Sequence, residues 1–419
     1  MDKVLLVDFG ATHIKSSIYD FNLEKHENFR KISAPQNISN KQLEFVVSQR
    51  NLVKIFKDIC ESYSVYGYAA IFISSQMHGF VVVDRQNNPL TDYIGWQDHR
   101  GPSLQIEEFE NITGMKDRVG LPVYNLHHMI ETEKCFDQKI KVVTLPDLLS
   151  NISGKSENLT HTTMLASTGF FDIRKNEISQ QIVNKFKCDL SFNDSTSLVE
   201  VSGYYGDIPI YAGIGDLQSA TYGANDPCSV NALVNIGTGS QVSMVSETKN
   251  PPVGVEYRPY VGHGHLHTIT HIPAGRSLSA YMNLFSSMGI NCWERIKKYS
   301  YDDFLRSTLE IDLSIFDSAR GFVSGGSISG IKENDLNIDN FLASLVKSLA
   351  LQYVPYIKKI SANNDIEKII LSGGIPRSIP AISVLISGWS NKPCMIQNTK
   401  IDETLCGLSN ISRDYCTKR

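Results

Sequence analysis

Two glycine-containing turns constrain the fold of this 419-residue chain more than any other feature. The stretch LLVDFGATHIKSSI (5–18) begins as an apolar run, turns at Phe9–Thr12 and continues with alternating apolar residues, which is the pattern of a β-hairpin. The stretch ALVNIGTGSQVSMV (232–245) repeats this plan. Two copies of one hairpin so far apart indicate an internal duplication, and a chain of this length favours two domains.

Strand and helix signals alternate around the two hairpins, which predicts an α/β protein with one hairpin in each half. No linker rich in proline, glycine or serine separates the halves, and we expect the boundary near 222–230. This gives an N-terminal domain at 1–224 and a C-terminal domain at 225–419. Helices are predicted at 41–60, at 337–360 and from about Pro380.

Composition and charge exclude several classes of protein. The formal net charge of −4, without a cluster of lysine and arginine, argues against a nucleic-acid-binding surface. The first residues, MDKVLLVDFG, lack the pattern of a signal peptide, and no stretch approaches about 18 uninterrupted apolar residues. The eight cysteines are scattered, with no C-x-x-C pair, so we expect reduced thiols in a cytoplasmic protein that binds no membrane and no nucleic acid.

The two glycine turns carry groups that bind phosphate. Each turn exposes backbone N–H groups, to which a threonine adds a hydroxyl donor, and Asp8 at the end of the first strand could hold Mg²⁺ through water. One such turn is also typical of an ordinary hairpin, but two matching turns favour a nucleoside triphosphate, which needs donors from more than one side. The candidate residues are Gly10, Thr12 and Lys15 in the first turn, and Gly237, Thr238 and Gly239 in the second.

A third glycine-rich stretch, LSGGIPRSIP (371–380), follows an apolar strand and opens a helix. Gly373 and Gly374 would let a flat ring or a phosphate approach the backbone closely, although a plain turn between a strand and a helix has the same composition. No G-x-x-x-x-G-K-[ST] run is present, so the sequence excludes a P-loop NTPase.

Two further stretches carry side chains suited to a polyol. SSQMHGF (74–80) places polar and apolar side chains directly after an apolar strand, where α/β proteins bind ligands. GWQDHR (95–100) combines an aromatic ring, an amide, an acid and a base. The simpler alternatives are a loop histidine satisfied by its surroundings and a surface turn with a local Asp–Arg pair. The candidate residues are Gln76, Met77, His78, Trp96 and Asp98.

Asp216 stands in AGIGDLQSA (212–220), at the end of an apolar strand and among small residues. Three roles are open to it. As a helix N-cap it would contribute about 1 kcal/mol. As a Mg²⁺ ligand it would share a site with Asp8, and as a general base it would take a hydroxyl proton during phosphoryl transfer.

Four histidines follow one another in HGHLHTITH, at positions 263, 265, 267 and 271. They have the same parity, so on one continuous strand they would share a face. Such a face suits a metal site, and it is also typical of a solvated strand.

These stretches, in their order and spacing, resemble the FGGY carbohydrate kinases across nearly the whole chain. DFGATHIK and NIGTGS resemble the two phosphate motifs of that family, GGIPRS its adenosine motif, and DETLCGLSN the helix of small residues near its C-terminus. QMHG is similar to the sugar-binding motif of xylulokinases, and GIGD to the segment with the catalytic aspartate. Within the family, WQDHR, GDLQSATY and ASTGFFDI most resemble the sedoheptulokinases.

The resemblance implies the duplicated fold of actin, hexokinase and Hsp70, with two ribonuclease H-like α/β domains and a cleft between them that closes on the substrates. It implies ATP- and Mg²⁺-dependent phosphorylation of a ketose at its terminal hydroxyl, with sedoheptulose or a related heptulose as the expected sugar. The alternatives are a pentulose, such as xylulose or ribulose, and a catalytically silent regulator that binds sugar or nucleotide. The expected partners are small molecules, and a homodimer is compatible with them.

Carried over by residue, the resemblance makes Asp216 the general base, a sugar contact and a Mg²⁺ ligand, and Asp8 a second Mg²⁺ ligand. Ile375 and Pro376 replace the end of the adenosine motif, so we expect an adenine pocket of different shape. The implied sugar contacts are Gln76, Met77, His78, Trp96, Asp98 and Gln218. The implied ATP contacts are Gly10, Thr12, Lys15, Gly237, Thr238, Gly239, Gly373, Gly374 and Arg377.

Overall fold

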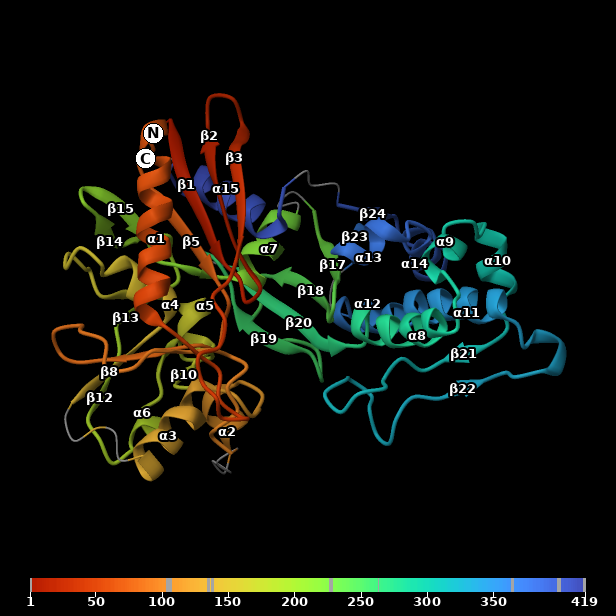
Figure 1. Ribbon diagram of the computed structural model, residues 1–419, viewed down its shortest axis with the longest axis horizontal. Coiled ribbons are helices and arrows are strands. Elements are labelled where there is room, and N and C mark those ends of the chain that lie inside the picture. Colours follow the sequence, from red (N-terminus) through yellow and green to blue (C-terminus); the bar gives the residue numbers. More distant parts are fainter. Residues whose placement is uncertain are drawn as a thin grey trace. The chain divides into compact units, whose positions relative to one another are not determined.

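The computed structural model forms two compact units (Figure 1). The first comprises Met1–Gly223, Tyr257–His265 and Thr399–Arg419, and the second comprises Ala224–Glu256 and Leu266–Asn398. The units are therefore discontinuous, whereas the sequence-based division used one break at 224/225. The structure describes residues 2–102, 108–133, 136, 139–225, 229–262, 264–362, 365–397 and 401–416.

The two units share one strand order, which confirms the predicted internal repeat. In the first, β1 pairs antiparallel with β2 and parallel with β5, giving the order β14-β15-β5-β1-β2-β3, with β16 also on β5. In the second, β17 pairs antiparallel with β18 and parallel with β23, giving β20-β18-β17-β23-β24. The first set is β1 (Lys3–Phe9), β2 (His13–Asp20), β3 (Lys25–Ser33), β5 (Ile71–Ser75), β14 (Val201–Tyr205), β15 (Ile208–Tyr211) and β16 (Ile214–Gly215). The second set is β17 (Asn231–Ile236), β18 (Ser240–Ser246), β20 (His265–Ile272), β23 (Lys368–Ser372) and β24 (Cys394–Ile396).

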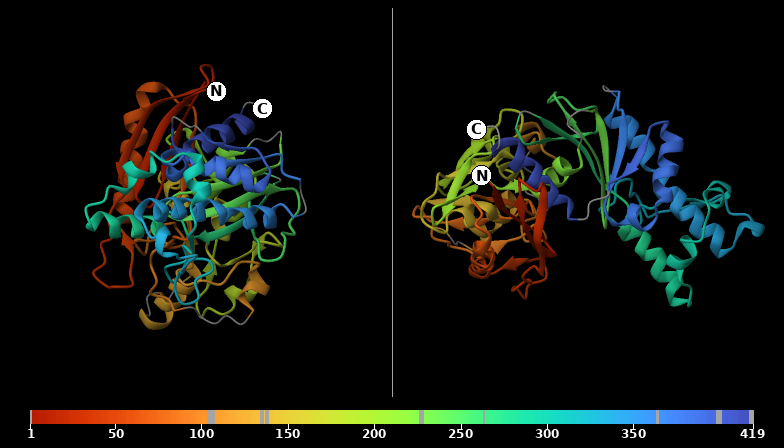
Figure 2. Two further views of the ribbon diagram at one scale, coloured as in Figure 1. Left: turned by 90° about the vertical axis from the view of Figure 1, so that its right-hand side faces the viewer. Right: turned by 90° about the horizontal axis from the view of Figure 1, so that it is seen from above.

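Strand β1 is apolar on both faces because helices cover both sides of its sheet. Leu5 and Val7 belong to the core that includes α1 (Gln49–Tyr63) and α4 (Leu145–Ser150). Val4 and Leu6 belong to the opposite core, which includes α15 (Glu403–Cys416). Figure 2 shows this C-terminal helix, in blue, and the N-terminal strands, in red, within the same unit. Since side chains alternate along a strand, Asp8 falls on the face covered by α15.

Helix α15 lies very close to α7 (Asp216–Ala224), the helix that begins at the candidate catalytic residue. A Cβ atom on Gly407 would lie 1.8 Å from the carbonyl oxygen of Ser219, and one on Gly223 would lie 2.5 Å from the backbone nitrogen of Gly407. No side chain fits at either glycine. The crossing therefore fixes α7, and with it Asp216, against the helix that covers the sheet.

Two helices differ from their predicted extents. Helix α1 begins at Gln49 rather than near 41, because residues 46 and 47 form the short strand β4 (Val46–Val47), which pairs with β7 (Tyr93–Ile94). The helix predicted at 337–360 is interrupted at Gln352, giving α11 (Ile338–Leu351) and α12 (Tyr353–Ile360). Pro355 explains the interruption, because its ring cannot donate a backbone hydrogen bond and would clash with the carbonyl of Leu351.

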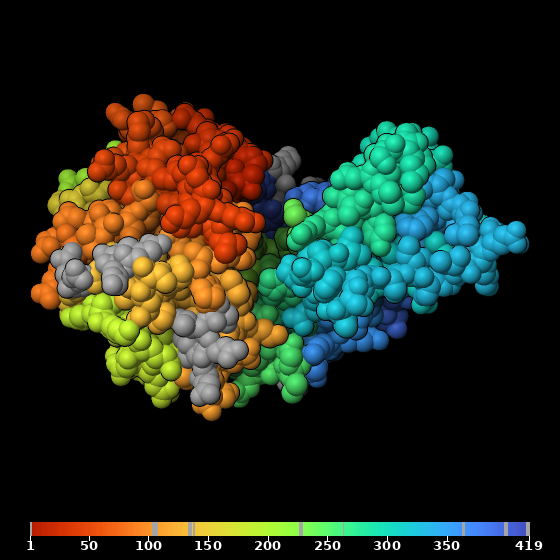
Figure 3. Space-filling model, turned by 60° about the horizontal axis from the view of Figure 1, so that its bottom comes forward, coloured from red at the N-terminus to blue at the C-terminus, as the bar shows by residue number. Residues whose placement is uncertain are grey.

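The remaining elements surround these sheets, and Figure 3 shows the segment near 310–335, in cyan and blue, on the surface of the second unit. Within the described ranges, no helix is long and apolar enough to cross a membrane. In the first unit lie β6 (Val81–Val83), β8 (Ile140–Val143), β9 (Leu159–His161), β10 (Phe171–Asp172), β11 (Glu177–Ile178), β12 (Leu190–Ser191), β13 (Asp194–Thr196), η1 (Ser64–Tyr66), α2 (Phe109–Thr113), α3 (Pro122–Glu133), α5 (Thr162–Ala166) and α6 (Gln180–Val183). In the second lie α8 (Gly275–Ser287), α9 (Cys292–Ile296), α10 (Tyr301–Arg306), β21 (Glu310–Ile311), β22 (Ile328–Ser329), η2 (Glu333–Asp335), α13 (Gly374–Ser378) and α14 (Ala381–Ser390).

The helix crossing predicts that replacing a helical glycine by alanine destabilises the protein, whereas this replacement usually stabilises a helix. Gly407→Ala should lower the free energy of unfolding by about 2 kcal/mol, because the new methyl group collides with a backbone oxygen. Gly388→Ala in α14 is the matched control, since its Cβ would meet only the Tyr301 hydroxyl at 3.2 Å, and alanine is otherwise the better helix former. Chemical denaturation of both variants measures the difference, and equal stabilisation by the two alanines would contradict the close crossing.

Candidate active site

Asp8 and Lys15 form the polar end of the first hairpin. Asp8 is 1% exposed, and its Oδ2 lies 3.2 Å from Nζ of Lys15, which also lies 2.7 Å from Oδ2 of Asp402 at the start of α15. Burial raises the pKa of Asp8 to about 7, although Lys15 acts in the opposite direction. Oδ1 of Asp8 has no hydrogen-bond partner among the described residues. A buried carboxylate oxygen without a partner is suited to a cation or a bound water.

The first turn, Gly10–Thr12, is accessible beside this carboxylate. Thr12 is exposed, and a Cβ on Gly10 would lie 2.9 Å from the carbonyl oxygen of His13, so the turn closes tightly. Lys15, expected at a phosphate, is ion-paired with two carboxylates. The turn amides and the Thr12 hydroxyl therefore remain the predicted phosphate donors here, and Lys15 would have to leave at least one carboxylate to join them.

The two glycine motifs of the second unit lie side by side, because they follow adjacent parallel strands. Asn235 on β17 is opposite Ser372 on β23, and the two side chains form a hydrogen bond of 2.9 Å. Gly373 has φ 96°, and a Cβ there would lie 2.3 Å from the carbonyl oxygen of Ile236, so the position requires glycine. Thr238, Gly239, Gly374 and Arg377 are exposed around these turns, whereas Ile375 and Pro376 are buried.

The second turn is also held from its far side by helix α8. Gly275 donates its N–H to the carbonyl of Gly237 over 3.0 Å, and Arg276 donates to the carbonyl of Thr238 over 2.8 Å. Gly237 donates its own N–H to the carbonyl of Gly239 over 3.0 Å, so all three carbonyls of the turn are satisfied within the protein. The N–H groups of the exposed Thr238 and Gly239, and the Thr238 hydroxyl, are the groups that could contact phosphate.

Asp216 is half-buried and is the first residue of α7. Its Oδ1 accepts the N–H of the next residue, Leu217, over 2.8 Å. Asp216 is therefore the first residue within the helix and does not make the bond of an N-cap, which runs to the second or third residue of the helix. Burial raises the pKa of Asp216 to about 6, while Leu217 and the cations Lys15 and Arg258 favour its ionised form. A carboxyl group with this pKa is ionised at neutral pH and is a stronger base than an ordinary aspartate.

A narrow pocket with a cavity volume of about 10 Å³, room for about one water molecule, lies beside Asp216 in the first unit. A Cβ on Gly215, the preceding residue, would lie 2.6 Å from Oε1 of Gln218 and 2.8 Å from the sulfur of Met77, so the pocket wall reaches the backbone at Asp216. Three predicted sugar contacts, Met77, His78 and Gln218, are thus brought together. The full lining is Met77, His78, Met115, Ala166, Ser167, Ile173, Gln218, Tyr257, Arg258 and Pro259.

Two polar side chains of this pocket are held in place by backbone groups. Nδ1 of His78 donates to the carbonyl of Ser167 over 2.8 Å, and the backbone N–H of His78 donates to the Ser167 hydroxyl over 3.1 Å. Gln218 is fully buried, and its Nε2 donates to the carbonyl of Pro259 over 3.2 Å. Oε1 of Gln218 has no partner among the described residues, and the same is true of Oε1 of Gln76, which lies outside the lining.

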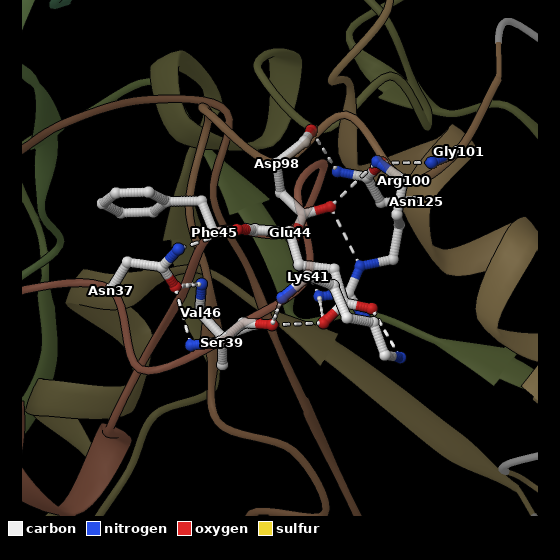
Figure 4. A network of polar contacts seen from close by, with 10 residues as sticks. All are labelled: Asn37, Ser39, Lys41, Glu44, Phe45, Val46, Asp98, Arg100, Gly101 and Asn125. Carbon is white, nitrogen blue, oxygen red and sulfur yellow. Dashed lines mark hydrogen bonds and ion pairs between the residues drawn. The ribbon is translucent and has the colours of Figure 1, made fainter.

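Asp98 and Trp96 do not line this pocket. Asp98 is 0% exposed, and Figure 4 shows its carboxylate enclosed by Arg100 and the backbone of Phe45. Arg100 donates to it through Nε over 2.9 Å and through Nη2 over 2.7 Å, and the Phe45 N–H donates over 2.8 Å. Both oxygens are therefore used within the protein, as in the local Asp–Arg pair that the sequence left open. Trp96 is 43% exposed, so its sugar contact remains a prediction, as does that of Asp98.

The pocket also contains residues that the sequence did not single out. Tyr257, Arg258 and Pro259 lie on β19 (Glu256–Pro259), and they reach the pocket by packing that no local pattern reveals. Met115 and Ile173 supply apolar wall; Met115 lies in an otherwise ordinary stretch, whereas Ile173 ends the stretch ASTGFFDI. The signal for Ala166 and Ser167 was present in ASTGFFDI, whose small residues permit the close approach of His78.

The histidines predicted to share one strand face do not form a metal site. His267 is 1% exposed and its Nε2 is bonded to the carbonyl of Thr248, His265 pairs with the Tyr257 hydroxyl, and His271 is exposed with φ 61°. His263 lies outside the described residues. Across the described ranges, no group of three or more His, Cys, Asp or Glu side chains could hold a metal ion, and the five described cysteines are free.

Comparison with known families places the chain in one of them. The sequence model of the N-terminal domain of the FGGY family of carbohydrate kinases matches residues 3–223. The chain belongs to this family. The gluconate kinase of Lactobacillus acidophilus has a TM-score of 0.84 at 16% identity, covering 100% of this chain and 90% of its own, which confirms the predicted fold class.

Two curated relatives are a xylulose kinase and an apulose kinase. The xylulose kinase of Lactococcus lactis subsp. lactis is 24% identical over 333 residues, covering 73% of this chain and 64% of its own length. The apulose kinase of Pectobacterium atrosepticum is 22% identical over 277 residues, covering 58% of this chain and 55% of its own length. The matches thus span less than two thirds of either relative, and neither name refers to a heptulose.

The buried Asp8 predicts how the stability of the protein depends on pH. Its pKa is raised from 3.8 to about 7 on folding, so the native state holds a proton that the unfolded chain releases between these values. Stability should therefore fall as the pH rises from about 4 to 7, by about 3 kcal/mol relative to Asp8→Asn, which cannot ionise. Denaturation at several pH values without divalent cations measures this, and parallel curves for the two proteins would contradict it.

Proposed function

We propose that this protein transfers the γ-phosphoryl group of ATP to the terminal hydroxyl of a ketose. The observation that carries the proposal is the position of Asp216 at the start of α7, next to a pocket that presents His78 and Gln218. A half-buried carboxylate beside polar groups suited to hydroxyls is the arrangement that a sugar kinase requires. Membership of the FGGY family supports the same reaction.

In this mechanism Asp216 accepts the proton of the attacking hydroxyl. Its Oδ1 is engaged by Leu217, which leaves Oδ2 for the substrate. The pKa of about 6 keeps the group ionised at neutral pH while making it more basic than a solvent-exposed aspartate. Gln218, with an unpaired Oε1 fixed by the bond from Nε2 to Pro259, would accept a hydrogen bond from a second sugar hydroxyl.

The residues present fit ATP and Mg²⁺. The unpaired Oδ1 of Asp8 is a suitable ligand for Mg²⁺, which commonly binds one or two carboxylates together with phosphate oxygens and water. The ion would neutralise charge on the transferring phosphoryl group. Within the first unit, the amides of the first turn are candidate phosphate donors. Within the second, the exposed residues Thr238, Gly239 and Gly374 are candidate donors, and Arg377 is exposed on α13.

Within the ketoses, we propose a pentulose as the substrate. The names of the two curated relatives, xylulose kinase and apulose kinase, support a five-carbon sugar. A heptulose is the second candidate, because Gln218 follows Asp216 in the stretch that most resembles the sedoheptulokinases and offers an unpaired acceptor to a further hydroxyl.

Replacing the proposed base should abolish phosphoryl transfer. Asp216→Asn should lower kcat by about 10²- to 10⁴-fold, because the amide cannot accept the proton. Asp207→Asn, at a side chain that is 99% exposed, is the control and should retain wild-type kcat. A coupled assay of ADP release measures both, with thermal unfolding as the check on folding. Activity of Asp216→Asn within a few-fold of wild type would assign the base to another group.

A panel of ketoses should identify the sugar. With ATP and Mg²⁺, kcat/KM for xylulose or ribulose should exceed that for sedoheptulose by about tenfold or more, since a pocket excludes additional atoms by contacts worth about 1–3 kcal/mol. The reverse order would make the protein a heptulose kinase. ATP binding without ADP release on any sugar would make it a regulator and would contradict the proposed enzyme.

A further inference from the structure

A chain of hydrogen bonds ends on the backbone of Gly215, the residue before Asp216. Gly215 donates its N–H to Oγ1 of Thr163 over 3.1 Å, and this hydroxyl lies 2.8 Å from Nδ1 of His161. Nε2 of His161 lies 3.2 Å from the carbonyl oxygen of Ser197. The chain therefore connects β16 to α5, to the end of β9 and to the segment that precedes β14.

The chemistry of the groups fixes which atom donates and which accepts in each of these hydrogen bonds. The carbonyl of Ser197 can only accept, so Nε2 of His161 carries the proton and Nδ1 is an acceptor. Burial lowers the pKa of His161 to about 4, which keeps the ring neutral. Nδ1 accepts both the hydroxyl and, over 3.2 Å, the backbone N–H of Thr163. Because the Thr163 hydroxyl donates its proton to the His161 ring, its oxygen is free to accept the N–H of Gly215. Consecutive hydrogen bonds of this kind strengthen one another.

Thr162 and Thr163 are adjacent and both buried, but only Thr163 belongs to this chain of hydrogen bonds. Thr163 and His161 are both 0% exposed. Thr162 is 1% exposed, and its Oγ1 has no partner among the residues that the structure describes. The bonds of Thr163 are therefore specific to its position and are not a general property of buried hydroxyls in α5.

The same chain reaches the opposite wall of the sugar pocket. The Ser197 carbonyl also accepts the N–H of Gly262 over 2.9 Å, shortly after the pocket residues of β19. At the same end of β19, the carbonyl of its last residue, Pro259, accepts the bond from Gln218 on α7. One network thus connects the backbone before Asp216 with the strand that completes the pocket.

Gly215 has no side chain to hold it, so its backbone is restrained by its pairing with Ser75 on β5 and by the bond to Thr163. A Cβ there would press on the ends of the Gln218 and Met77 side chains, and glycine has the greatest backbone freedom. A rotation of the Gly215 backbone would redirect the carboxylate of Asp216. We propose that Thr163, oriented by His161, is a positioning residue that aims Asp216 at the sugar hydroxyl through the N–H of Gly215. The proposal rests on the proposed kinase function only in its last step, in which the orientation of Asp216 determines the rate of phosphoryl transfer.

The test compares three variants, of which the two replacements of threonine by valine are isosteric. Thr163→Val removes the acceptor of the Gly215 N–H, Thr163→Ser keeps it, and Thr162→Val is the matched control that loses no hydrogen bond among the described residues. Hydrogen–deuterium exchange of the Gly215 amide tests directly whether its hydrogen bond to Thr163 is present. It is measured by mass spectrometry of fragments of the 212–217 segment. Steady-state kinetics with ATP and the ketose panel read its consequence, and thermal unfolding checks folding.

In Thr163→Val we expect the Gly215 amide to exchange about tenfold faster or more, since its bond is lost. We expect kcat to fall about 10- to 100-fold with the sugar KM within about threefold, because misaiming affects the transition state more than ground-state binding. Thr163→Ser and Thr162→Val should behave as wild type in both measurements. A purely structural role would lower stability in Thr163→Val without this split between kcat and KM.

Each outcome that differs from these expectations refutes one specific part of the proposal. Unchanged exchange in Thr163→Val overturns the hydrogen-bond chain, whether or not the protein is a kinase. Faster exchange with unchanged kcat overturns the positioning role. If Thr163→Val does not fold, loss of activity in Thr163→Ser despite a protected amide overturns the proposal instead. A wild-type protein without ADP release on any sugar refutes the proposed function, and the exchange measurement still decides whether the chain of bonds exists.

Discussion

The ion-paired Lys15 is the interaction on which the architecture of the first unit depends. Asp8 is buried on the strand face covered by α15, where Lys15 favours its ionised form without offsetting burial, so its pKa stays raised to about 7. Lys15 also contacts Asp402, which directly precedes α15. The same ammonium therefore connects β1, β2 and the start of the C-terminal helix. Through the crossing at Gly407, the position of α15 in turn determines that of α7 and Asp216.

The sequence predicted those features that depend on short-range pattern. The repeated hairpin follows from alternation of side chains and from glycine in the turns, and both strand orders agree with it. Asp216 could be singled out because a lone carboxylate at the end of an apolar strand is costly without a use. Met77 and His78 were found because they follow a strand end, where ligands of α/β folds bind. Gln218 was implied only by the resemblance to the sedoheptulokinases.

What the sequence did not reveal depends on packing between distant segments. Tyr257, Arg258 and Pro259 became pocket residues only because β19 packs in the first unit. The carboxylate of Asp98 is equally able to bind a sugar or an arginine, and only the folded chain shows that Arg100 and Phe45 use both of its oxygens. The interruption at Gln352 could have been predicted from Pro355, whose effect on a helix is local.

The candidate site combines two opposing requirements of a general base. Burial makes Asp216 more basic, but burial alone would leave it protonated, and Lys15 and Arg258 limit that effect without pairing so closely that the group loses its basicity. The Asp8 carboxyl, more deeply buried, has the higher pKa of the two, so a cation at its free oxygen would be needed to keep it ionised at neutral pH. A bound cation there would add a positive charge close to Asp216 and lower its pKa as well. Binding of Mg·ATP would then prepare the two carboxylates together, which couples the basicity of the site to the presence of its phosphoryl donor.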